Sequence, residues 1–336
     1  MGVRCRDRGR ALGDCSDHGL SVQQNDCLVR ENTDRILTWD HPLNQFPIHI
    51  ALASDIRGVT GLAVTVHSAL QATERPVHVW IVQEGIDLQT QRRLLASWKA
   101  FANLAGAHFL DMRQLPIKLP QWWARSRWPM SAASRFQLPL LMPKDAHRCI
   151  YLDIDILVGA DLGELYDIDM AGHPVAMTPA TELSSDENRA YIVSLGLQPE
   201  TYCNSGVLLM DLTAWRRERA SEALIAMGRG MRPDLWFFDQ DMLNTFFKGR
   251  CMFLDPRWNY RDALATNQGR VQHFVGSPKP WQTKSGDSAA AGLVAWHATR
   301  AANAFQPFPA SPLSRLVRVW RLAIARIQRT WLRLGR

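Results

Sequence analysis

The chain has 336 residues, 46% of them hydrophobic and 21% charged, which is enough for one large α/β domain with extensions or for two smaller domains. The net charge is +7, and residues 311–336 contain seven arginines but no lysine, aspartate or glutamate, so the rest of the chain is electrically balanced. This balance excludes a generally basic nucleic-acid-binding surface, and we expect no nucleic-acid partner.

The cysteines and the apolar runs indicate the cellular environment. The six cysteines show no C-x-x-C spacing, so they indicate neither a zinc site nor a disulfide framework, and a reducing compartment is favoured. The N-terminus has no apolar segment typical of a signal peptide, and no uninterrupted apolar run reaches membrane-spanning length. These features predict a cytoplasmic protein.

Strand-like and helix-like runs alternate after a polar N-terminal stretch. Residues 1–45 are rich in Arg, Asp, Asn and Gln, which predicts a disordered extension. The following runs predict a strand at Ile48–Asp55, a helix at Leu62–Leu70, a strand at Val77–Val82, a helix at Leu88–Leu104 and a strand near Ala107–Leu110. This alternation predicts a parallel, Rossmann-like sheet, in which ligands bind beyond the carboxyl ends of the strands. No G-x-G-x-x-G motif follows the first strand, so a dinucleotide cofactor is not expected.

Two acidic residues stand in the apolar run Cys149–Val158, which we interpret as one buried strand. Asp153 and Asp155 lie two residues apart, and such residues in an extended chain point the same way, so the carboxylates are expected to converge. Unpaired carboxylates at the end of an apolar strand are costly unless a cation neutralises them. Hard oxygen ligands suit Mg²⁺ or Mn²⁺. Asp-x-Asp alone is also compatible with an ordinary turn after a strand.

The remaining elements flank this stretch. A Pro- and Trp-rich loop at 115–130 precedes it, and Trp122, Trp123 and Trp128 either stack on sugar faces or form a lid that packs down. The later elements are expected to be a turn or short helix at Asp161–Tyr166, strands at Val175–Met177 and Cys203–Leu212, an amphipathic helix from Thr213 to Met227, and a helix beginning at Phe238–Asn244 with Asp239 or a neighbour as its cap.

Four blocks of sequence together resemble a known family. They are Tyr151–Asp155, Asn204–Met210, Asp239–Asp241 and the H-x-x-G-x-x-K-P-W block from His273 to Trp281. In this order and spacing they resemble glycosyltransferase family 8, the retaining enzymes that include glycogenin and bacterial lipopolysaccharide galactosyl- and glucosyltransferases. The resemblance covers roughly residues 47–284. It implies a GT-A fold, a nucleotide-diphosphate sugar as donor, usually UDP-linked, and Mn²⁺ or a similar ion such as Mg²⁺.

The matched positions imply roles at a metal and diphosphate site. Asp153, Asp155 and His273 would supply three ligands of a six-coordinate ion. Gly276 would let the backbone approach a phosphate closely, and Lys279 would offset the charge that develops on the leaving group. Taken alone, His273 is also compatible with a structural role.

Other matched positions imply contacts with the donor. Arg135 would lie near the diphosphate and donor sugar, although a surface ion pair is the alternative. Asp239 would hold sugar hydroxyls and Gln240 would lie close to the anomeric carbon, while Asn204 would orient the sugar or the acceptor. Ala53 and Asp55, at the end of the first strand, would contact the donor. The family commonly reads D-D/E-N-Y from Asp55, whereas this chain continues Ile56-Arg57-Gly58, so uridine binding by this segment stays open.

The resemblance predicts a retaining, metal-dependent hexosyltransferase that moves glucose or galactose from a UDP-sugar to a glycan or glycolipid acceptor such as the lipopolysaccharide core. An amide is a poor nucleophile, so Gln240 favours front-face displacement over a covalent glycosyl-enzyme. The alternative is a catalytically degenerate protein that binds nucleotide sugars at the membrane surface, which the changed Ile56-Arg57-Gly58 segment would favour. The sequence does not choose between glucose and galactose.

The basic tail has helical periodicity. Apolar residues recur at three- or four-residue steps, namely Leu313, Leu316, Trp320, Ile324, Ile327, Trp331 and Leu334. Arginines on the other faces exclude a spanning segment and predict a helix lying on an anionic membrane surface, with basic residues there worth roughly 1 kcal/mol each. A helix packed on the body is the alternative.

We expect four regions: the extension 1–45, a GT-A domain at 46–284, a connecting helix and linker at 285–310, and a membrane-associating helix at 311–336. The last region would place the enzyme on the inner face of the cytoplasmic membrane.

Overall fold

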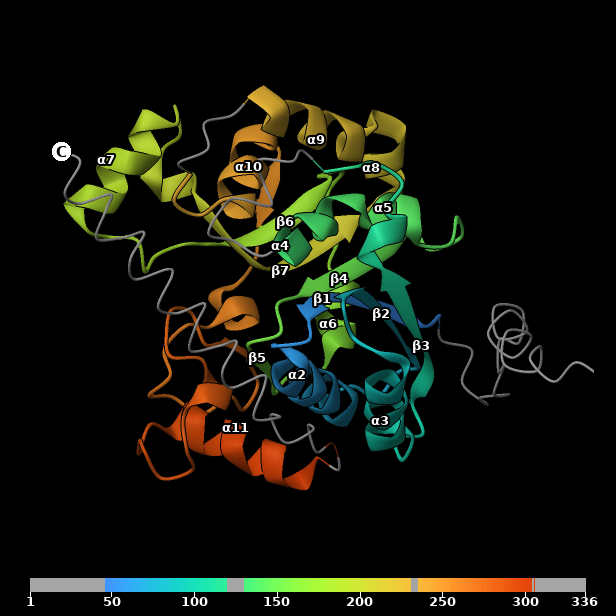
Figure 1. Ribbon diagram of the computed structural model, residues 1–336. Coiled ribbons are helices and arrows are strands. Elements are labelled where there is room, and N and C mark those ends of the chain that lie inside the picture. The colour runs from blue at the N-terminus through green and yellow to red at the C-terminus, as the bar shows by residue number, and fades with distance from the viewer. Residues whose placement is uncertain (1–45, 120–129, 231–234, 304, 306–336) are drawn as a thin grey trace, which may run out of the picture. The chain divides into compact units, whose positions relative to one another are not determined.

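A seven-stranded mixed sheet forms the centre of the fold, in the order β3-β2-β1-β4-β7-β6-β8 (Figure 1). The computed structural model describes residues 46–119, 130–230, 235–303 and 305. The strands of the sheet are β1 (Ile48–Asp55), β2 (Val77–Glu84), β3 (Leu104–Asp111), β4 (Arg148–Leu152), β6 (Val175–Pro179), β7 (Cys203–Asp211) and β8 (Cys251–Phe253). The predicted parallel, Rossmann-like arrangement is confirmed for β3, β2, β1 and β4, whereas β7 runs antiparallel to both of its neighbours. The carboxyl ends of β1 and β4 therefore meet at one edge.

A small second sheet pairs two distant parts of the chain. It consists of β5 (Ile156–Val158) and β9 (Val271–His273), which run antiparallel. In their register Ile156 lies opposite His273. This pairing brings His273 next to the aspartates that precede β5, although more than a hundred residues separate them in sequence.

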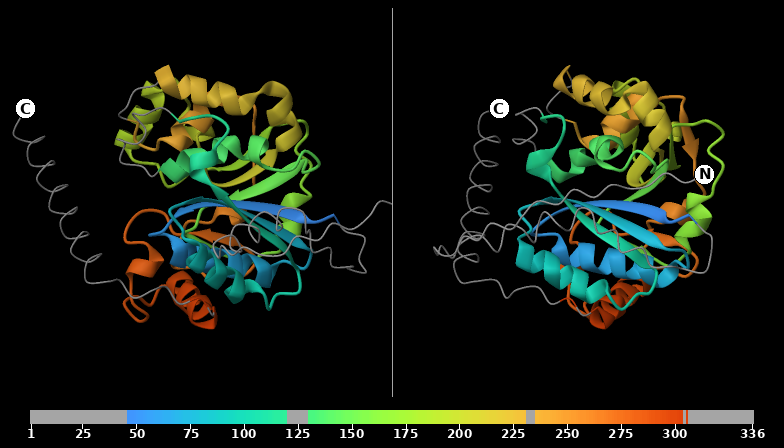
Figure 2. Two further views of the ribbon diagram at one scale, coloured as in Figure 1. Left: turned by 45° about the vertical axis from the view of Figure 1, so that its right-hand side comes forward. Right: turned by 90° about the vertical axis from the view of Figure 1, so that its right-hand side faces the viewer.

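Helices cover both faces of the large sheet (Figures 1 and 2). One face carries α2, α3 and α11, and the opposite face carries α4, α5, α8, α9 and α10. The helices are α2 (Val59–Ala72), α3 (Leu88–Trp98), α4 (Met130–Ser134), α5 (Leu138–Leu141), α6 (Leu162–Tyr166), α7 (Asp186–Ser194), α8 (Leu212–Glu218), α9 (Ala220–Gly230), α10 (Asp239–Phe246) and α11 (Ala291–Ala302), with 3₁₀ turns η2 (Met112–Gln114), η4 (Arg135–Gln137), η5 (Pro199–Thr201), η6 (Pro256–Asn259) and η7 (Pro280–Gln282).

The alternation of β1 divides the core into two layers. Ile50 and Leu52 point to the layer that α2 and α3 cover, where Trp98 is fully buried. Ala51 and Ala53 point to the opposite layer. Because both faces are covered, β1 is apolar along nearly its whole length, as expected for a central parallel strand.

The predicted single strand Cys149–Val158 is wrong. β4 ends at Leu152, a turn carries Asp153 to Asp155, and β5 then belongs to the other sheet. The hydroxyl of Thr65 on α2 donates to the carbonyls of Ile154 (2.9 Å) and Ile156 (2.8 Å) and so draws the chain away from the large sheet. The carboxylates thus converge across a turn, not along an extended strand.

Two predicted helices are too long. The helix predicted at Leu88–Leu104 ends at Trp98, because Asn103 closes the turn to β3 by donating to the carbonyl of Thr73 (2.6 Å). The helix predicted from Thr213 to Met227 is two helices, broken at Arg219, whose φ is +52°. At α10 the cap is the backbone of Phe238 and not the side chain of Asp239, which is the first helical residue.

Asp211, at the end of β7, caps α8 by accepting the amide of Ala214 (2.8 Å), and Cys149 and Cys203 are buried. The predicted extension 1–45, the three loop tryptophans Trp122, Trp123 and Trp128, and the basic tail 311–336 lie outside the described residues. The predicted division into regions stays a prediction, and α11 lies within the stretch predicted to hold a connecting helix. None of the described helices combines the length and apolar character needed to cross a membrane.

One arginine holds the connection between α5 and β4. Arg216 of α8 donates to five carbonyls of residues 139–146, at 2.8–3.2 Å. We expect Arg216→Met to lower the free energy of unfolding by about 3 kcal/mol, since hydrogen bonds to a charged donor are lost together. Chemical denaturation measures this loss. Arg217→Met, which removes the neighbouring exposed guanidinium, should change stability by at most about 0.5 kcal/mol, and an equal loss in both variants would contradict the account.

Three histidines form a ladder across β1, β2 and β3. The rings of His49 and His78 lie 5.4 Å apart and those of His78 and His108 5.7 Å apart, with Trp80 stacked on His108 at 4.0 Å. Burial, reinforced by the charge of His78, lowers the pKa of His49 and of His108 to about 4. Unfolding therefore takes up protons once the pH falls below the ordinary value near 6.5.

The ladder predicts acid sensitivity. The stability that depends on neutral His49 and His108 is complete above pH 6.5 and is lost as the pH falls towards 4. We expect a loss on the order of 1 kcal/mol for each histidine between pH 6.5 and 5, because the partial exposure of both rings screens part of the effect. Denaturation at a series of pH values checks this. His108→Gln should flatten the pH dependence, whereas replacement of the exposed His147 should not. An unchanged slope in His108→Gln would refute the assignment.

Candidate active site

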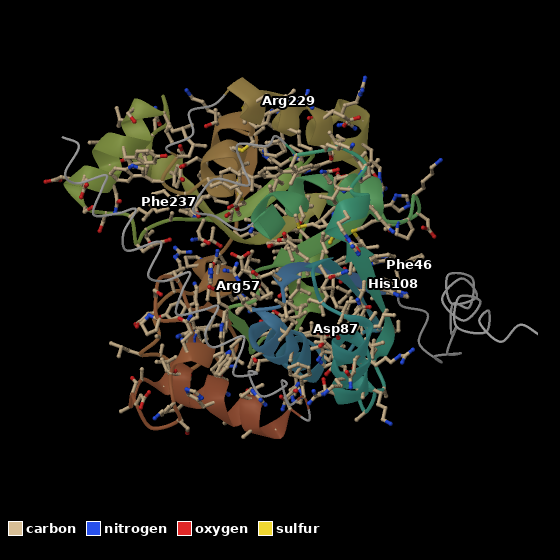
Figure 3. All side chains as sticks on the ribbon, viewed as in Figure 1. Phe46, Arg57, Asp87, His108, Arg229 and Phe237 are labelled. Carbon is tan, nitrogen blue, oxygen red and sulfur yellow. The ribbon has the colours of Figure 1, made fainter. Side chains whose placement is uncertain are left out.

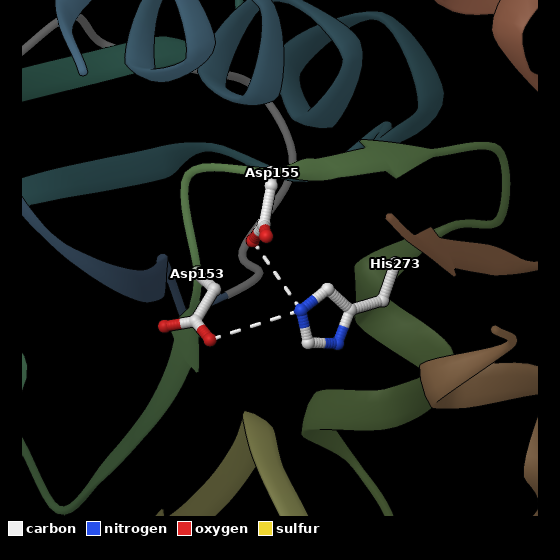
Figure 4. A group of neighbouring side chains, drawn as sticks. All are labelled: Asp153, Asp155 and His273. Carbon is white, nitrogen blue, oxygen red and sulfur yellow. Dashed lines mark ion pairs between the residues drawn. The ribbon is translucent and has the colours of Figure 1, made fainter. Parts of the chain in front are cut away.

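Two carboxylates and one imidazole converge where β4 ends (Figure 4). The Nε2 atom of His273 lies 3.3 Å from Oδ1 of Asp155 and 3.8 Å from Oδ2 of Asp153. One ligand atom from each residue lies within 4.8 Å of the others, and within the described ranges this is the one such group of His, Cys, Asp and Glu. Asp155 and His273 are buried, and Asp153 is half-buried. The structure therefore brings together the three predicted metal ligands.

The imidazole of His273 is oriented from behind by an amide that the sequence analysis missed. Asn259, 1% exposed, donates through Nδ2 to Oδ1 of Asn204 (2.9 Å), so its own Oδ1 faces Nδ1 of His273, also at 2.9 Å. Nδ1 then donates to this amide oxygen, and Nε2 faces the two carboxylates. A Cβ on Gly206 would lie 2.2 Å from the imidazole Cε1, so glycine alone fits beneath the ring.

This donor set fits a hard divalent cation. Two carboxylates and a neutral imidazole match the ligands of Mn²⁺. Diphosphate oxygens would then occupy coordination positions of the ion that water would otherwise fill. Burial opposes the charge on Asp155, yet His273, when protonated, and the Lys279 ammonium hold the pKa of this carboxyl well below its ordinary range. The Nζ of Lys279 contacts Oδ2 of Asp155 and donates to the carbonyl of Phe274 (3.1 Å).

Arg135 is buried rather than a surface ion pair. It is 4% exposed, and its guanidinium lies 3.0 Å from Asp153 and 3.0 Å from Asp239. It also donates to the carbonyls of Ala132 (2.8 Å) and Ser205 (2.7 Å). With its donors directed to these protein groups, Arg135 fixes two carboxylates in one place.

Asp239 and Gln240 begin α10 beside this group. Ser205 donates through Oγ to Asp239 (2.9 Å) and through its amide to Oε1 of Gln240 (3.1 Å). Burial raises the pKa of Asp239 to about 6, Asp153 adds to the effect, and Arg135 opposes it. Both side chains are therefore oriented by β7, the strand that also carries Asn204 and Gly206.

The end of β1 packs on the Asp-x-Asp turn. A Cβ on Gly58 would lie 2.3 Å from Cδ1 of Ile154, so the end of the Ile154 side chain packs closely on the segment that departs from the family pattern. Asp55 accepts the amides of Arg57 (2.9 Å) and Gly58 (3.1 Å) and forms an ion pair with the exposed Arg57 (Figure 3). Ala53 is 8% exposed. Asp55 is therefore occupied by its own loop, and the expected donor contact of Ala53 and Asp55 stays a prediction.

Gly276 and Asn204 complete the predicted set. Gly276 has φ of +80° and nothing within 4 Å of a Cβ position, so its backbone conformation favours glycine. Asn204 is held by Asn259, by the amide of Gly206 (2.9 Å) and by its donation to Glu182 (3.1 Å). Its amide therefore supports the site from within a network and is largely used by protein partners.

The sequence offers only weak signals for Asn259 and Ser205, the two site residues that the prediction missed. Asn259 stands between Trp258 and Tyr260 in a Pro-containing stretch with no diagnostic spacing, and only its pairing with His273 reveals it. Ser205 belongs to the quoted Asn204–Met210 block, where its small polar side chain next to Gly206 was the available signal.

Asn259 yields a prediction that does not depend on turnover. We expect Asn259→Leu to weaken Mn²⁺ binding about 10- to 100-fold, because the imidazole of His273 loses the partner that fixes its tautomer. Electron paramagnetic resonance of free Mn²⁺ measures the affinity. His273→Ala should weaken binding more. Wild-type affinity in Asn259→Leu would contradict the orienting role.

Comparison with known proteins agrees with this geometry. A family model described as glycosyl transferase family 8 matches residues 49–285. The chain belongs to that family.

Relatives and solved structures support the assignment. The chain is 24% identical to the lipopolysaccharide 1,3-galactosyltransferase of Salmonella typhimurium over 70% of this chain and 73% of that protein. It is 27% identical to general stress protein A of Bacillus subtilis over 71% of this chain and 88% of that protein. The galactosyltransferase LgtC, solved with donor and acceptor sugar analogs, superposes with a TM-score of 0.61 at 23% identity, over 78% of this chain and 98% of LgtC. The fold is GT-A, and this family 8 chain is a hexosyltransferase.

Proposed function

We propose that this glycosyltransferase moves glucose or galactose from a UDP-sugar to a glycan or glycolipid acceptor with retention of configuration. The observation that carries the proposal is the convergence of Asp153, Asp155 and His273, with Arg135 and Lys279 beside them. Such a group provides both a cation site and a positive charge for a diphosphate. Relatives that act on lipopolysaccharide support a core sugar as the acceptor.

The cation would be held by Asp153, Asp155 and His273. When bound, Mn²⁺ or Mg²⁺ supplies Lewis-acid neutralisation of the diphosphate. Lys279 is already at this place, and its ammonium offsets charge on the departing β-phosphate. Gly276, three residues before Lys279, lets the backbone approach the phosphate.

Arg135, Asp239 and Gln240 would act on the sugar side. Arg135 holds the carboxylate of Asp239, which accepts hydrogen bonds from donor hydroxyls. Gln240, oriented by Ser205, would lie at the anomeric face, and its neutral amide disfavours a covalent glycosyl-enzyme. The bond from the anomeric carbon to phosphate oxygen breaks, and the acceptor oxygen bonds from the same face. Attack from this face accounts for retention, and the acceptor's proton passes to the departing phosphate.

A donor panel tests the proposal. UDP-glucose, UDP-galactose, GDP-mannose and ADP-glucose are incubated with the protein and Mn²⁺, and nucleotide release is measured. We expect slow hydrolysis of one of the two UDP-sugars, with the sugar first released as the α-anomer in proton NMR. Hydrolysis of only the GDP- or ADP-sugar would overturn the uridine assignment, and first release of the β-anomer would overturn retention.

A second candidate is a nucleotide-sugar-binding protein without catalysis. The pairing of Arg57 with Asp55, in the segment that departs from the family pattern, favours it. Tight UDP binding in calorimetry, with no hydrolysis and no product from a pool of lipopolysaccharide acceptors, would establish this candidate.

The sequence of residues 311–336 supports a further proposal, that the enzyme works at the cytoplasmic membrane surface. Its arginines and recurring apolar residues suit binding to anionic lipid. Flotation with vesicles containing phosphatidylglycerol tests this. Truncation after Pro309 should abolish flotation and leave UDP-sugar hydrolysis unchanged, and a truncated protein that still floats would refute the role of the tail.

A further inference from the structure

A cavity of about 390 Å³ opens beside α7, and none of its described lining residues belongs to the metal group. Its volume falls in the range of roughly 300–1,000 Å³ that is typical of sites for small ligands. It is lined by Glu187, Ala190, Tyr191, Ser194, Leu195, Leu235 and Trp236. The lining thus combines aromatic and aliphatic surface with a carboxylate and a hydroxyl, which the exposed Glu187 and Ser194 contribute.

The aromatic wall of this cavity is rigidly built. The rings of Tyr191 and Trp236 lie 4.2 Å apart and within 2° of parallel. The hydroxyl of Tyr191 accepts the amide of Trp236 (2.8 Å) and donates to Asp241 (2.6 Å). Asp241 is itself fully buried and accepts the amide of Phe237 (2.9 Å). The stacked pair is therefore preorganised before any ligand binds.

The hydrogen bonds of Tyr191 and Asp241 also connect the cavity to the proposed reaction site. Asp241 follows Asp239 and Gln240 in the first turn of α10, and Phe237 packs edge-on against Tyr191. The aromatic pair is thus fixed to the helix that presents the two residues assigned to the donor sugar. A ligand in the cavity would therefore contact residues that are fixed to α10, the helix that also positions Asp239 and Gln240.

We propose that the Tyr191–Trp236 cavity is a carbohydrate subsite that binds a pyranose ring of the acceptor. The inference rests on the proposed glycan acceptor. An apolar sugar face suits a flat aromatic wall, and the ring hydroxyls find Glu187 and Ser194 at the rim. The carboxylate disfavours an acyl chain, because a charged group facing hydrocarbon would lose its water. The subsite raises affinity for the acceptor and takes no part in breaking the donor bond.

Two substitutions test the subsite in different ways. Ala190→Trp fills the cavity from the exposed side of α7 and removes no existing contact, whereas Trp236→Ala deletes half of the aromatic wall. Val193→Trp, on the same helix at a position 58% exposed and outside the lining, is the matched control for added bulk. Saturation-transfer NMR is recorded with methyl α-D-glucopyranoside, methyl β-D-galactopyranoside, lactose and maltose.

We expect at least one of the four glycosides to bind the wild-type protein. Ala190→Trp and Trp236→Ala should weaken that binding about tenfold or more, and Val193→Trp should not. UDP-sugar hydrolysis should stay within about twofold of wild type in Val193→Trp, which lies outside the cavity lining.

Two results would overturn the subsite: none of the four glycosides binds, or both cavity variants bind them as the wild type does. Failure of the proposed function looks different. In that case the wild-type protein binds a glycoside in a cavity-dependent manner but hydrolyses no nucleotide sugar.

Discussion

Asp155→Ala is expected to lower sugar transfer and UDP-sugar hydrolysis about a thousandfold or more. Asp155 is 6% exposed and faces both His273 and Lys279, so its loss removes a proposed cation ligand and releases the ammonium that would face the phosphate. Mn²⁺ affinity should fall in parallel. Steady-state assays at saturating Mn²⁺ and calorimetry with Mn²⁺ measure the two effects.

Two controls separate chemistry from folding. Asp155→Asn keeps the size and hydrogen-bonding capacity of the side chain, so its melting temperature should stay near wild type while activity is lost. Glu84→Ala removes an exposed acid at the end of the neighbouring strand β2 and should leave activity intact. Substantial transfer by both Asp155 variants would refute the catalytic assignment of this group.

Arg135→Met is expected to damage both stability and transfer. The guanidinium is buried and faces Asp153 and Asp239, so its removal leaves two carboxylates without their shared counter-charge. Breaking a buried ion pair on one side costs about 3–5 kcal/mol. Guanidinium denaturation should show a loss of this size, and transfer should fall below detection because Asp153 and Asp239 lose their positions.

A double variant tests the cause. Asp239→Asn removes one of the two negative charges, so the Arg135→Met/Asp239→Asn protein should lose less stability than the sum of the single losses. Additive losses would mean that Arg135 acts through packing against Tyr151, whose ring lies 4.2 Å from the guanidinium, instead of through charge.

Local sequence patterns predict the first half of the sheet well. β1 and β2 begin at the predicted residues, because mainly apolar runs that directly follow Pro47 and Pro76 determine strands locally. The turn between Asp153 and Asp155 does not follow from local pattern. It depends on Thr65, some ninety residues earlier, whose hydroxyl draws the chain towards α2. The helix predicted to reach Leu104 is too long for a similar reason. Asn103 contacts Thr73, thirty residues earlier, and this contact forms the turn before β3.

Some residues of the candidate site are predicted from the sequence, and others are visible only in the tertiary structure. Asp153, Asp155 and His273 stand in blocks that the family resemblance identifies, and the structure brings them together. Asn259 orients His273 from a different loop, and such a partner is visible only after β9 has paired with β5. The burial of Arg135 is also a tertiary effect, because α4, β4 and β7 enclose it together with its two acids.

The central claim is that the group of Asp153, Asp155 and His273 binds a cation that in turn holds a uridine diphosphate. Calorimetric titration of UDP into the full-length protein, with Mn²⁺ and again with EDTA, tests it most directly. We expect UDP to bind at least about tenfold more tightly with Mn²⁺, and Asp155→Ala to abolish the difference. Equal UDP affinity with and without Mn²⁺ in the wild-type protein, or a full Mn²⁺ effect in Asp155→Ala, would contradict it.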